Sequence, residues 1–337
     1  MRVLITGGAG YIGTHTMLEV LGAGHEVCVI DNFSNSSPEA LERVRTLSNR
    51  SFTFHKTDLR DREGLTTNLK EFDPDAVIHF GGLKAVGESV EIPLEYYENN
   101  VQGTINLLQA MKATNCNNIV FSSSATVYGD PDFLPFTEDH PLRPTSPYGR
   151  NKLHIEEMLR DLATANPDFT AAILRYFNPV GAHESGRIGE DPLGIPNNLM
   201  PMIAQVAIGR RKQVKVFGND YETADGTGVR DYIHVNDLAR AHLAALEWAA
   251  ANNGSRAFNL GLGQGVSVME MIAAYAKASG RDVPYQISGR RDGDIAIFYA
   301  DATRAQAELG WKAEFGLTDM CASSWHWQDT NPLGYKA

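Results

Sequence analysis

The chain has 337 residues, and its 30 lysines and arginines against 41 aspartates and glutamates give it a formal net charge of −11. This charge excludes a nucleic-acid binder that works through a general basic surplus, because such proteins carry an excess of positive charge. Hydrophobic residues make up 43% of the chain and charged residues 21%, which permits a sizeable core and argues against general disorder. The length predicts one large domain or two unequal ones.

The three cysteines, Cys28, Cys116 and Cys321, lie far apart and form no CxxC pair. We expect them to be buried thiols in a reducing compartment. Residues 1–6 run directly into glycines, too short an apolar stretch for a signal peptide, and no later run reaches membrane-spanning length. The sequence therefore predicts a cytoplasmic protein without a membrane partner.

In the first half of the chain, short β-branched segments alternate with longer amphipathic ones, which is typical of a parallel sheet covered by helices on both faces. Buried strands are expected at residues 3–5, 27–30, 52–54, 76–78, 119–121 and 171–174. Helices are expected near residues 12–23, 61–71, 93–114 and 147–165. The predicted fold class is α/β with a doubly wound parallel sheet.

The alternation ends after residue 175, where prolines and glycines crowd the chain. We expect residues 1–177 to form a first domain, and residues 178–337 to form mainly a smaller α/β domain. A strand-like segment at residues 232–235 precedes a helical one at 239–250. The chain is therefore predicted to return to the first domain near residues 231–260.

The first expected strand ends in the sequence TGGAGYIG, which contains Gly7, Gly10 and Gly13. Such a turn lets the backbone approach a pyrophosphate, and the following helix start offers N–H groups and the positive end of its dipole. Asp31 ends the second expected strand, where a carboxylate accepts hydrogen bonds from an adenosine ribose and repels a 2′-phosphate. The pattern predicts a Rossmann-type site that prefers NAD to NADP. Asp58 is either an adenine contact or a helix cap.

Tyr148 and Lys152 lie four residues apart at the start of an expected helix, and therefore on one face of it. A phenolate base at neutral pH needs its pKa lowered by about three units from its usual value near 10. The Lys152 ammonium and a positive nicotinamide ring both favour the ionised form. Ser124 follows the fifth strand at the carboxyl edge of the sheet, where such folds bind ligands. We therefore interpret Ser124, Tyr148 and Lys152 as catalytic.

Several longer segments are more specific than any single motif. They read HFGGLKAVGES at residues 79–89, SSSATVYG at 122–129, LRYFNPVGA at 174–182, PNNLMP at 196–201 and DGTGVRDYIHV at 225–235. With the glycine turn and the Tyr148 segment they span nearly the whole chain. On these residues the sequence resembles the extended short-chain dehydrogenase/reductase superfamily, and within it the family of UDP-glucose 4-epimerases.

The resemblance implies a tightly held NAD. Besides Gly7, Gly10 and Gly13, its implied contacts are Tyr11, Ile12, Asp31, Asn32, Phe33, Ser34, Asn35, Ser36, Asp58, Leu59, Phe80, Gly81, Gly82, Leu83, Lys84, Asn99, Ser124, Tyr148, Lys152 and Phe177. Gly81 stands where the family is expected to carry alanine, a difference that we expect to matter little.

The resemblance also implies UDP-glucose and UDP-galactose as substrates, interconverted by transient oxidation at carbon 4, rotation of the 4-keto sugar and hydride return. The implied substrate contacts are Lys84, Ser124, Tyr148, Asn178, Asn198, Leu199, Phe217, Arg230, Arg291, Asp294 and Phe298. Arginines suit a diphosphate, an aromatic ring stacks on uracil, and a carboxylate accepts hydrogen bonds from a ribose. The resemblance further implies a homodimer that pairs the helices near residues 93–114 and 147–165.

Phe298 falls where the family lines its sugar pocket, and a small residue there accompanies acceptance of N-acetylated hexosamines. The large ring predicts a narrow pocket that prefers UDP-glucose and UDP-galactose. An aromatic core position is the alternative interpretation of Phe298.

Other functions stay open. A nucleotide-sugar 4,6-dehydratase has a similar fold but carries an Asp-Glu pair where this chain has Ala125 and Thr126, which supply no acid or base. A non-catalytic NAD-sensing protein does not need an intact Ser124, Tyr148 and Lys152 set. The ten histidines show no HExxH or comparable spacing, so no metal site is expected.

Overall fold

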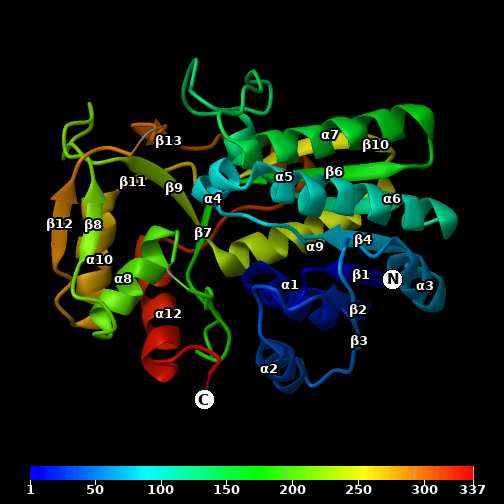
Figure 1. The fold of residues 1–337 in the computed structure, drawn as a ribbon, viewed down its shortest axis with the longest axis horizontal. Helices are drawn as coiled ribbons and strands as arrows, with labels where there is room; N and C mark the ends of the chain where they lie inside the picture. Colours follow the sequence, from blue (N-terminus) through cyan, green and yellow to red (C-terminus); the bar gives the residue numbers. More distant parts are fainter. Residues whose placement is uncertain (195, 292, 337) are drawn as a thin grey trace.

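The computed structural model describes residues 1–194, 196–291 and 293–336. Figure 1 shows a large sheet with helices on both sides of it, and a smaller group of strands and helices next to it that contains helix α12 near the C-terminus. The candidate site residues come from both groups.

The large sheet has seven strands in the order β10-β6-β5-β4-β1-β2-β3, and all of its pairings are parallel. Six of the strands overlap the six that the sequence predicts, and the doubly wound α/β fold class is confirmed. The strands are β1 Arg2–Thr6, β2 Glu26–Asp31, β3 Thr53–Lys56, β4 Ala76–His79, β5 Asn118–Ser124, β6 Thr170–Tyr176 and β10 Gly254–Leu260.

Two apolar cores fill the two faces of this sheet. One core packs against α1 Tyr11–Gly22, α2 Pro38–Ser48, α9 Val235–Ala251 and α11 Thr303–Leu309. The other packs against α3 Arg62–Phe72, α6 Gly103–Ala113 and α7 Pro147–Ala165. Four short helical segments complete this part: α4 Val86–Glu91, α5 Pro93–Tyr96, η1 Tyr97–Gln102 and η2 Ala125–Val127.

The strand order reverses at β1, which has β2 on one side and β4 on the other. Parallel α/β folds bind ligands in the crevice at such a reversal, outside the carboxyl ends of the strands. The ends of β1 and β4 are joined by a buried imidazole, because Nδ1 of His79 lies 2.6 Å from Oγ1 of Thr6 and its Nε2 lies 2.9 Å from Oγ1 of Thr104. These contacts hold the carboxyl ends of β1 and β4 together at the base of the crevice.

The smaller part holds a four-stranded sheet and a two-stranded one. The elements of this smaller part are β7 Asn178–Val180, α8 Leu199–Ala207, β8 Val214–Phe217, β9 Val229–His234, β11 Gly265–Ser267, α10 Val268–Ser279, β12 Tyr285–Ser288, β13 Ile297–Phe298 and α12 Leu317–Thr330.

The segment predicted as a strand at residues 232–235 is the end of β9, which pairs with β7, β11 and β13. The following α9 packs against the large sheet, and β10 is one of its strands.

Helix α2 was not expected from the sequence, although its start has a clear local cause. Ser37 caps it by accepting a hydrogen bond from the N–H of Glu39, and Pro38 occupies its first position. Its apolar side is narrow, with Ala40, Leu41 and Val44 buried and charged residues on much of the remaining surface.

All three cysteines are buried and free, as predicted. Within the ranges that the structure describes, no helix combines the length and the apolar character needed to cross a bilayer.

The glycine turn is so tightly packed that Gly13→Ala should destabilise the fold. An added Cβ would lie 2.5 Å from the carbonyl oxygen of Gly7, and overpacking of this kind costs about 1–3 kcal/mol. Gly22, in the same helix, has no atom within 4 Å of an added Cβ, so Gly22→Ala is a matched control that should be neutral or stabilising. Urea unfolding measures both, and equal stability of the two variants would contradict the packing.

Candidate active site

The glycine turn forms an open cradle between β1 and α1. Gly7 has a φ of +67°, and a Cβ there would lie 2.8 Å from the backbone nitrogen of Gly81, so glycine is required by both conformation and space. Helix α1 starts after Gly10 with no side-chain cap. Its first N–H groups and its dipole are therefore available to an anion.

Asp31 lies beside this cradle at the carboxyl end of β2. One of its carboxylate oxygens accepts from the N–H of Ala9 at 3.1 Å, and the other accepts from the N–H of Phe33 and the hydroxyl of Ser36, both at 2.9 Å. The turn and the loop after β2 are thus organised around one carboxylate, which fits the predicted ribose contact.

Asp58 does not cap a helix, because Asp61 caps α3. Its carboxylate instead accepts two hydrogen bonds from the Arg60 guanidinium, each 2.9 Å long, and one from Asn32 at 2.8 Å. The bonds from Arg60 hold the pKa of Asp58 well below its usual range. A charged, fixed carboxylate next to the loop after β2 leaves the adenine interpretation open.

The segment after β4 packs against the cradle through Gly81. A Cβ there would meet Cδ1 of Leu59 at 2.8 Å, so the side chain of Leu59 uses the space that an alanine at position 81 would fill. Asn100 orders the next residues, since its Oδ1 accepts from the N–H of Leu83 at 2.7 Å and from Nδ2 of Asn99 at 3.0 Å.

Helix α7 carries two of the three predicted catalytic residues. It starts where Ser146 accepts a hydrogen bond from the N–H of Gly149, with Pro147 in the first position. Nζ of Lys152 donates to the carbonyl oxygen of Ser122 at 2.6 Å, and Ser124 lies two residues further along the same strand. The structure thus brings the end of β5 and the first turns of α7 together.

Burial dominates the electrostatics of these side chains. It raises the pKa of Tyr148 to about 12, and hydrogen bonding to Ser124 only partly offsets it. It also lowers the pKa of Lys152 to about 8. The ammonium is directed at Ser122 and lies 5.8 Å from the ring centroid of Tyr148. Desolvation is thus the larger effect in the chain alone, and the lowering of the tyrosine pKa expected from Lys152 together with a bound nicotinamide ring stays a prediction for the cofactor-bound protein.

Four of the predicted substrate residues meet at the ends of β8 and β9. Asp294 pairs with Nε of Arg291 at 3.0 Å and with Nη2 of Arg230 at 3.6 Å. The Arg291 guanidinium lies 4.5 Å from the ring centroid of Phe217. Two arginines beside an aromatic ring suit a nucleoside diphosphate, with charge for the phosphates and a flat face for the base.

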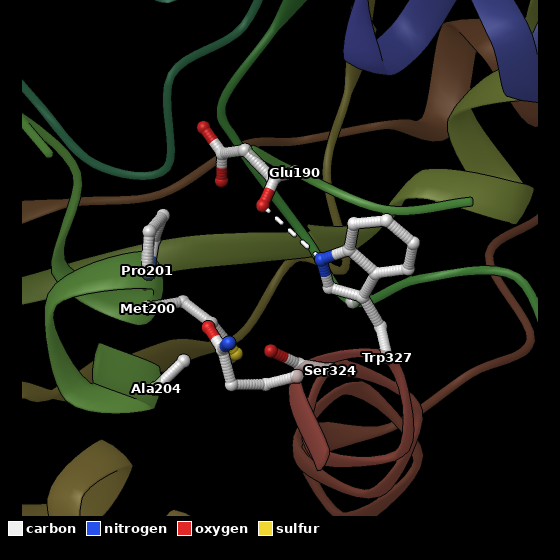
Figure 2. A pocket seen from close by; sticks show the side chains of 8 residues that line it. Glu190, Met200, Pro201, Ala204, Ser324 and Trp327 are labelled. Atoms are coloured by element: carbon white, nitrogen blue, oxygen red, sulfur yellow. Dashed lines mark hydrogen bonds between the residues drawn. The ribbon is translucent and has the colours of Figure 1, made fainter. Parts of the chain in front are cut away.

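Lys84 and Asn198 meet through a residue that the sequence analysis missed. Oε1 of Glu190 lies 3.4 Å from Nζ of Lys84 and accepts from Nδ2 of Asn198 at 3.1 Å. Figure 2 shows that the main-chain oxygen of Glu190 accepts from the indole nitrogen of Trp327, at 3.3 Å. The cavity drawn there has a volume of about 10 Å³, room for about one water molecule, so it is not a substrate site.

Phe298 lies in a small aromatic cluster, with only 9% of its surface exposed. Its ring centroid is 4.6 Å from that of Phe136 and 5.1 Å from that of Phe177. Position 298 is therefore partly a core position, and one edge of the cluster belongs to Phe177, a predicted cofactor contact. The structure thus supports the core interpretation of Phe298, and its place in a sugar pocket stays a prediction.

Local spacing would have identified one further residue. Glu156 follows Tyr148 and Lys152 at the same four-residue interval and lies against the strand that carries Ser124. Glu190 had no such signal, because its partner Lys84 lies 106 residues away in the sequence. Among the described residues, no group of three or more His, Cys, Asp or Glu side chains has a metal-binding arrangement.

Comparison with known proteins agrees with this geometry. A family model described as GDP-mannose 4,6 dehydratase matches residues 4–324. The chain is 58% identical over 337 residues to the UDP-glucose 4-epimerase of Bacillus subtilis (strain 168), covering 100% of this chain and 99% of that protein. It is 56% identical over 341 residues to the human UDP-glucose 4-epimerase, covering 99% and 98%.

A solved structure gives the same result. The UDP-glucose 4-epimerase from Bifidobacterium longum, crystallised in complex with NAD+ and UDP, has a TM-score of 0.96 and 54% identity, covering 99% of this chain and 100% of that one. Fold and site thus define an extended short-chain dehydrogenase/reductase of the NAD-dependent epimerase/dehydratase class. Within that class, the chain belongs to the family of UDP-glucose 4-epimerases.

The pKa of Tyr148 predicts a specific titration. In the cofactor-free protein we expect Tyr148 to stay protonated up to about pH 10, because an ordinary tyrosine is half ionised there and burial raises this one further. The ultraviolet absorbance of tyrosinate, taken as the difference between the unmodified protein and Tyr148→Phe, measures this. A Tyr148 signal near neutral pH without cofactor would show that the chain alone ionises the phenol.

Proposed function

We propose that this chain interconverts UDP-glucose and UDP-galactose in an NAD-dependent isomerisation at carbon 4 of the sugar. The observation that carries the proposal is the meeting of Ser124 with Tyr148 and Lys152 beside an uncapped glycine cradle. Full-length similarity to UDP-glucose 4-epimerases supports the same reaction.

The residues of the crevice fit a dinucleotide. The α1 start would hold the pyrophosphate, Asp31 the adenosine ribose, and Lys152 the nicotinamide ribose. When bound, NAD would supply the acceptor for the hydride of carbon 4 and the donor that returns it.

Tyr148 is the general base for the 4-hydroxyl of the sugar, and Ser124 donates a hydrogen bond to the same oxygen. Ser124 is held for this role, since its Oγ accepts from the N–H of Thr126 at 3.2 Å and from Oγ1 of Thr126 at 3.0 Å, which leaves its own hydrogen to donate. Because burial keeps the phenol protonated in the chain alone, positive charge brought by the bound dinucleotide completes the base.

The nucleotide half of the substrate is anchored by charge. In the chain alone, Arg230 and Arg291 both pair with the carboxylate of Asp294. A diphosphate offers these two arginines more acceptor oxygens than one carboxylate does. Phe217 receives the uracil. Binding energy is thus concentrated on UDP, which leaves the hexose free to present either face.

A dehydratase is the weaker alternative, although the matching family model carries a dehydratase name. The side chain of Ala125 is only a methyl group, and the hydroxyl of Thr126 donates a hydrogen bond to Oγ of Ser124. Neither can act as the extra acid or base that loss of water requires.

The direct test is to incubate the purified protein with UDP-galactose, without added cofactor, and to assay for UDP-glucose. We expect UDP-glucose to form without added cofactor, because the resemblance implies that NAD stays tightly bound during purification. The reverse conversion, from UDP-glucose, is expected as well. Tyr148→Phe should lower kcat by about 100-fold or more, since a positioned general base contributes at least that much. Near-normal turnover by Tyr148→Phe would contradict the assignment of the base, and absence of conversion by the unmodified protein would contradict the proposed reaction.

Substrate range depends on Phe298. We expect slow turnover of UDP-N-acetylglucosamine, and an increase of about tenfold in its kcat/KM for Phe298→Ser, because the proposed sugar pocket would gain the space that the ring now fills beside Phe177. Phe133, which is 49% exposed, gives the control Phe133→Ser, which should change nothing. Equal turnover of acetylated and plain sugars by the unmodified protein would contradict a narrow pocket.

The homodimer is proposed from apolar side chains exposed near α5. Val90 and Leu94 are 64% and 78% exposed, next to the helices that the sequence analysis pairs across a twofold axis. Leu94→Glu should shift the protein from dimer to monomer in sedimentation experiments, whereas Leu333→Glu, at a side chain that is 61% exposed near the C-terminus, should not. A monomeric unmodified protein would contradict the proposal. We also propose a cytoplasmic location for the protein, which the free cysteines support.

A further inference from the structure

The carboxylate of Glu156 is fully buried beneath the active site and accepts four hydrogen bonds. Its donors are Oγ of Ser123 at 2.6 Å, Nε and Nη2 of Arg175 at 3.0 and 2.6 Å, and Nη2 of Arg160 at 2.6 Å. Burial alone would raise the pKa of this carboxyl, but the hydrogen bonds from Arg175 hold it below its usual value. Glu156 is therefore a charged group with a full set of partners.

The partners of Glu156 lie on two neighbouring strands. Ser123 on β5 and Arg175 on β6 are directly paired residues in the large sheet. Arg175 uses its remaining nitrogen, Nη1, to donate to the hydroxyl of Tyr128 at 3.0 Å and to the carbonyl oxygen of Glu138 at 3.3 Å. One carboxylate on α7 thus binds both strands next to the end of β5.

The same helix face carries the catalytic side chains. Tyr148, Lys152 and Glu156 follow one another at four-residue intervals, so they lie in one row along α7. Consecutive turns of this row contact consecutive residues of β5, because Lys152 donates to the carbonyl of Ser122 and Glu156 accepts from Ser123. The next residue of the strand is Ser124.

We infer that Glu156 is a positioning residue of the active site, which fixes the row of Tyr148 and Lys152 against the strand that carries Ser124. The inference rests on the proposed function in one respect, namely that these three residues act on the substrate. Glu156 touches neither substrate nor cofactor in this account, and its effect passes through its neighbours.

Charge adds to the geometry. Burial lowers the pKa of Lys152 to about 8, and the negative charge of Glu156 opposes that change. The imidazole of His79, which reaches toward Lys152 from β4, carries no competing charge at neutral pH, since burial lowers its pKa to about 3. Tyr148 is also neutral, because burial raises its pKa to about 12.

The charged and titratable groups that face Glu156, besides Lys152, come from three places in the fold. Arg160 lies on α7, Arg175 on β6, and the hydroxyl of Tyr128 follows β5, where burial raises its pKa to about 12. Because the hydrogen bonds from Arg175 hold the pKa of Glu156 below its usual value, the charge on Glu156 is constant over the range in which Lys152 responds.

The experiment is a titration of Lys152 in the full-length protein by NMR of 15N-labelled lysine, with the signal assigned by its loss in Lys152→Met. We expect Glu156→Gln to lower the midpoint of Lys152 by about one pH unit, because the negative charge of Glu156 raises the pKa of Lys152 and loss of an opposite charge nearby shifts a pKa by roughly this much. Glu157→Gln is the matched control, since Glu157 is the exposed neighbour on the same helix, and it should leave the midpoint unchanged. An unchanged midpoint in Glu156→Gln would overturn the inference.

If Glu156→Gln does not fold, Glu156→Asp replaces it. The shorter side chain keeps its charge for Arg175 but withdraws the carboxylate from the row. We expect the Lys152 midpoint to fall below that of the unmodified protein, and an equal midpoint would overturn the inference.

A second arm tests the link to the strand without changing a charge. Ser123→Ala removes only the hydroxyl that joins β5 to Glu156 and leaves the ion pair in place. We expect kcat to fall about tenfold while KM for UDP-galactose and the NAD content stay the same; unchanged kcat would overturn the link. The lysine titration needs no substrate, so it judges the inference even if the unmodified protein fails to convert UDP-galactose.

Discussion

Burial from water governs the active-site end of α7. The Tyr148 hydroxyl and the Lys152 ammonium lie where β5 ends, and each is pushed toward its neutral form, the phenol by a raised pKa and the amine by a lowered one. A catalytic pair needs the opposite in each case. The surrounding residues are therefore arranged to offset desolvation: a carbonyl for the ammonium, a serine for the phenol, and a carboxylate one turn further along the helix.

Burial also disfavours the charged form of the Glu156 carboxylate, and hydrogen bonds from Arg175 offset this effect. Ion pairs of this kind add little net stability compared with apolar residues, yet losing one partner costs about 3–5 kcal/mol because a bare charge remains. The pair between Glu156 and Arg175 is consequently better understood as a device that fixes geometry. It determines where α7 lies on the sheet, and thereby how far Tyr148 is from Ser124.

The net charge of −11 is compatible with anionic ligands because the positive features are local. The start of α1 has no capping side chain, and Arg230 and Arg291 share Asp294. Glu190 holds Lys84 and Asn198 in a similar way. In the chain alone, the basic groups are therefore kept ordered by carboxylates that a phosphate group can replace.

Much of this was predictable where the signal is local in sequence. Six strands of the large sheet, the glycine turn, Asp31 and the row that begins with Tyr148 follow from periodicity or spacing, whereas β10 was not predicted as a strand. Contacts between distant segments were not predictable, as with Glu190 and Lys84, which lie 106 residues apart. The strand at residues 232–235 was recognisable as a strand, but hydrophobic pattern does not say which sheet a strand joins, and β9 pairs within the smaller part. The tyrosine pKa was expected to fall because charge was considered and burial was not.

The most direct test of the central claim follows the hydrogen on carbon 4. UDP-galactose carrying deuterium at that carbon is incubated with the purified protein in ordinary water, and the UDP-glucose formed is analysed by mass spectrometry. We predict that the deuterium stays on carbon 4 of the product, because the same site removes the deuterium from that carbon and returns it. Replacement of the deuterium by hydrogen from water would contradict it.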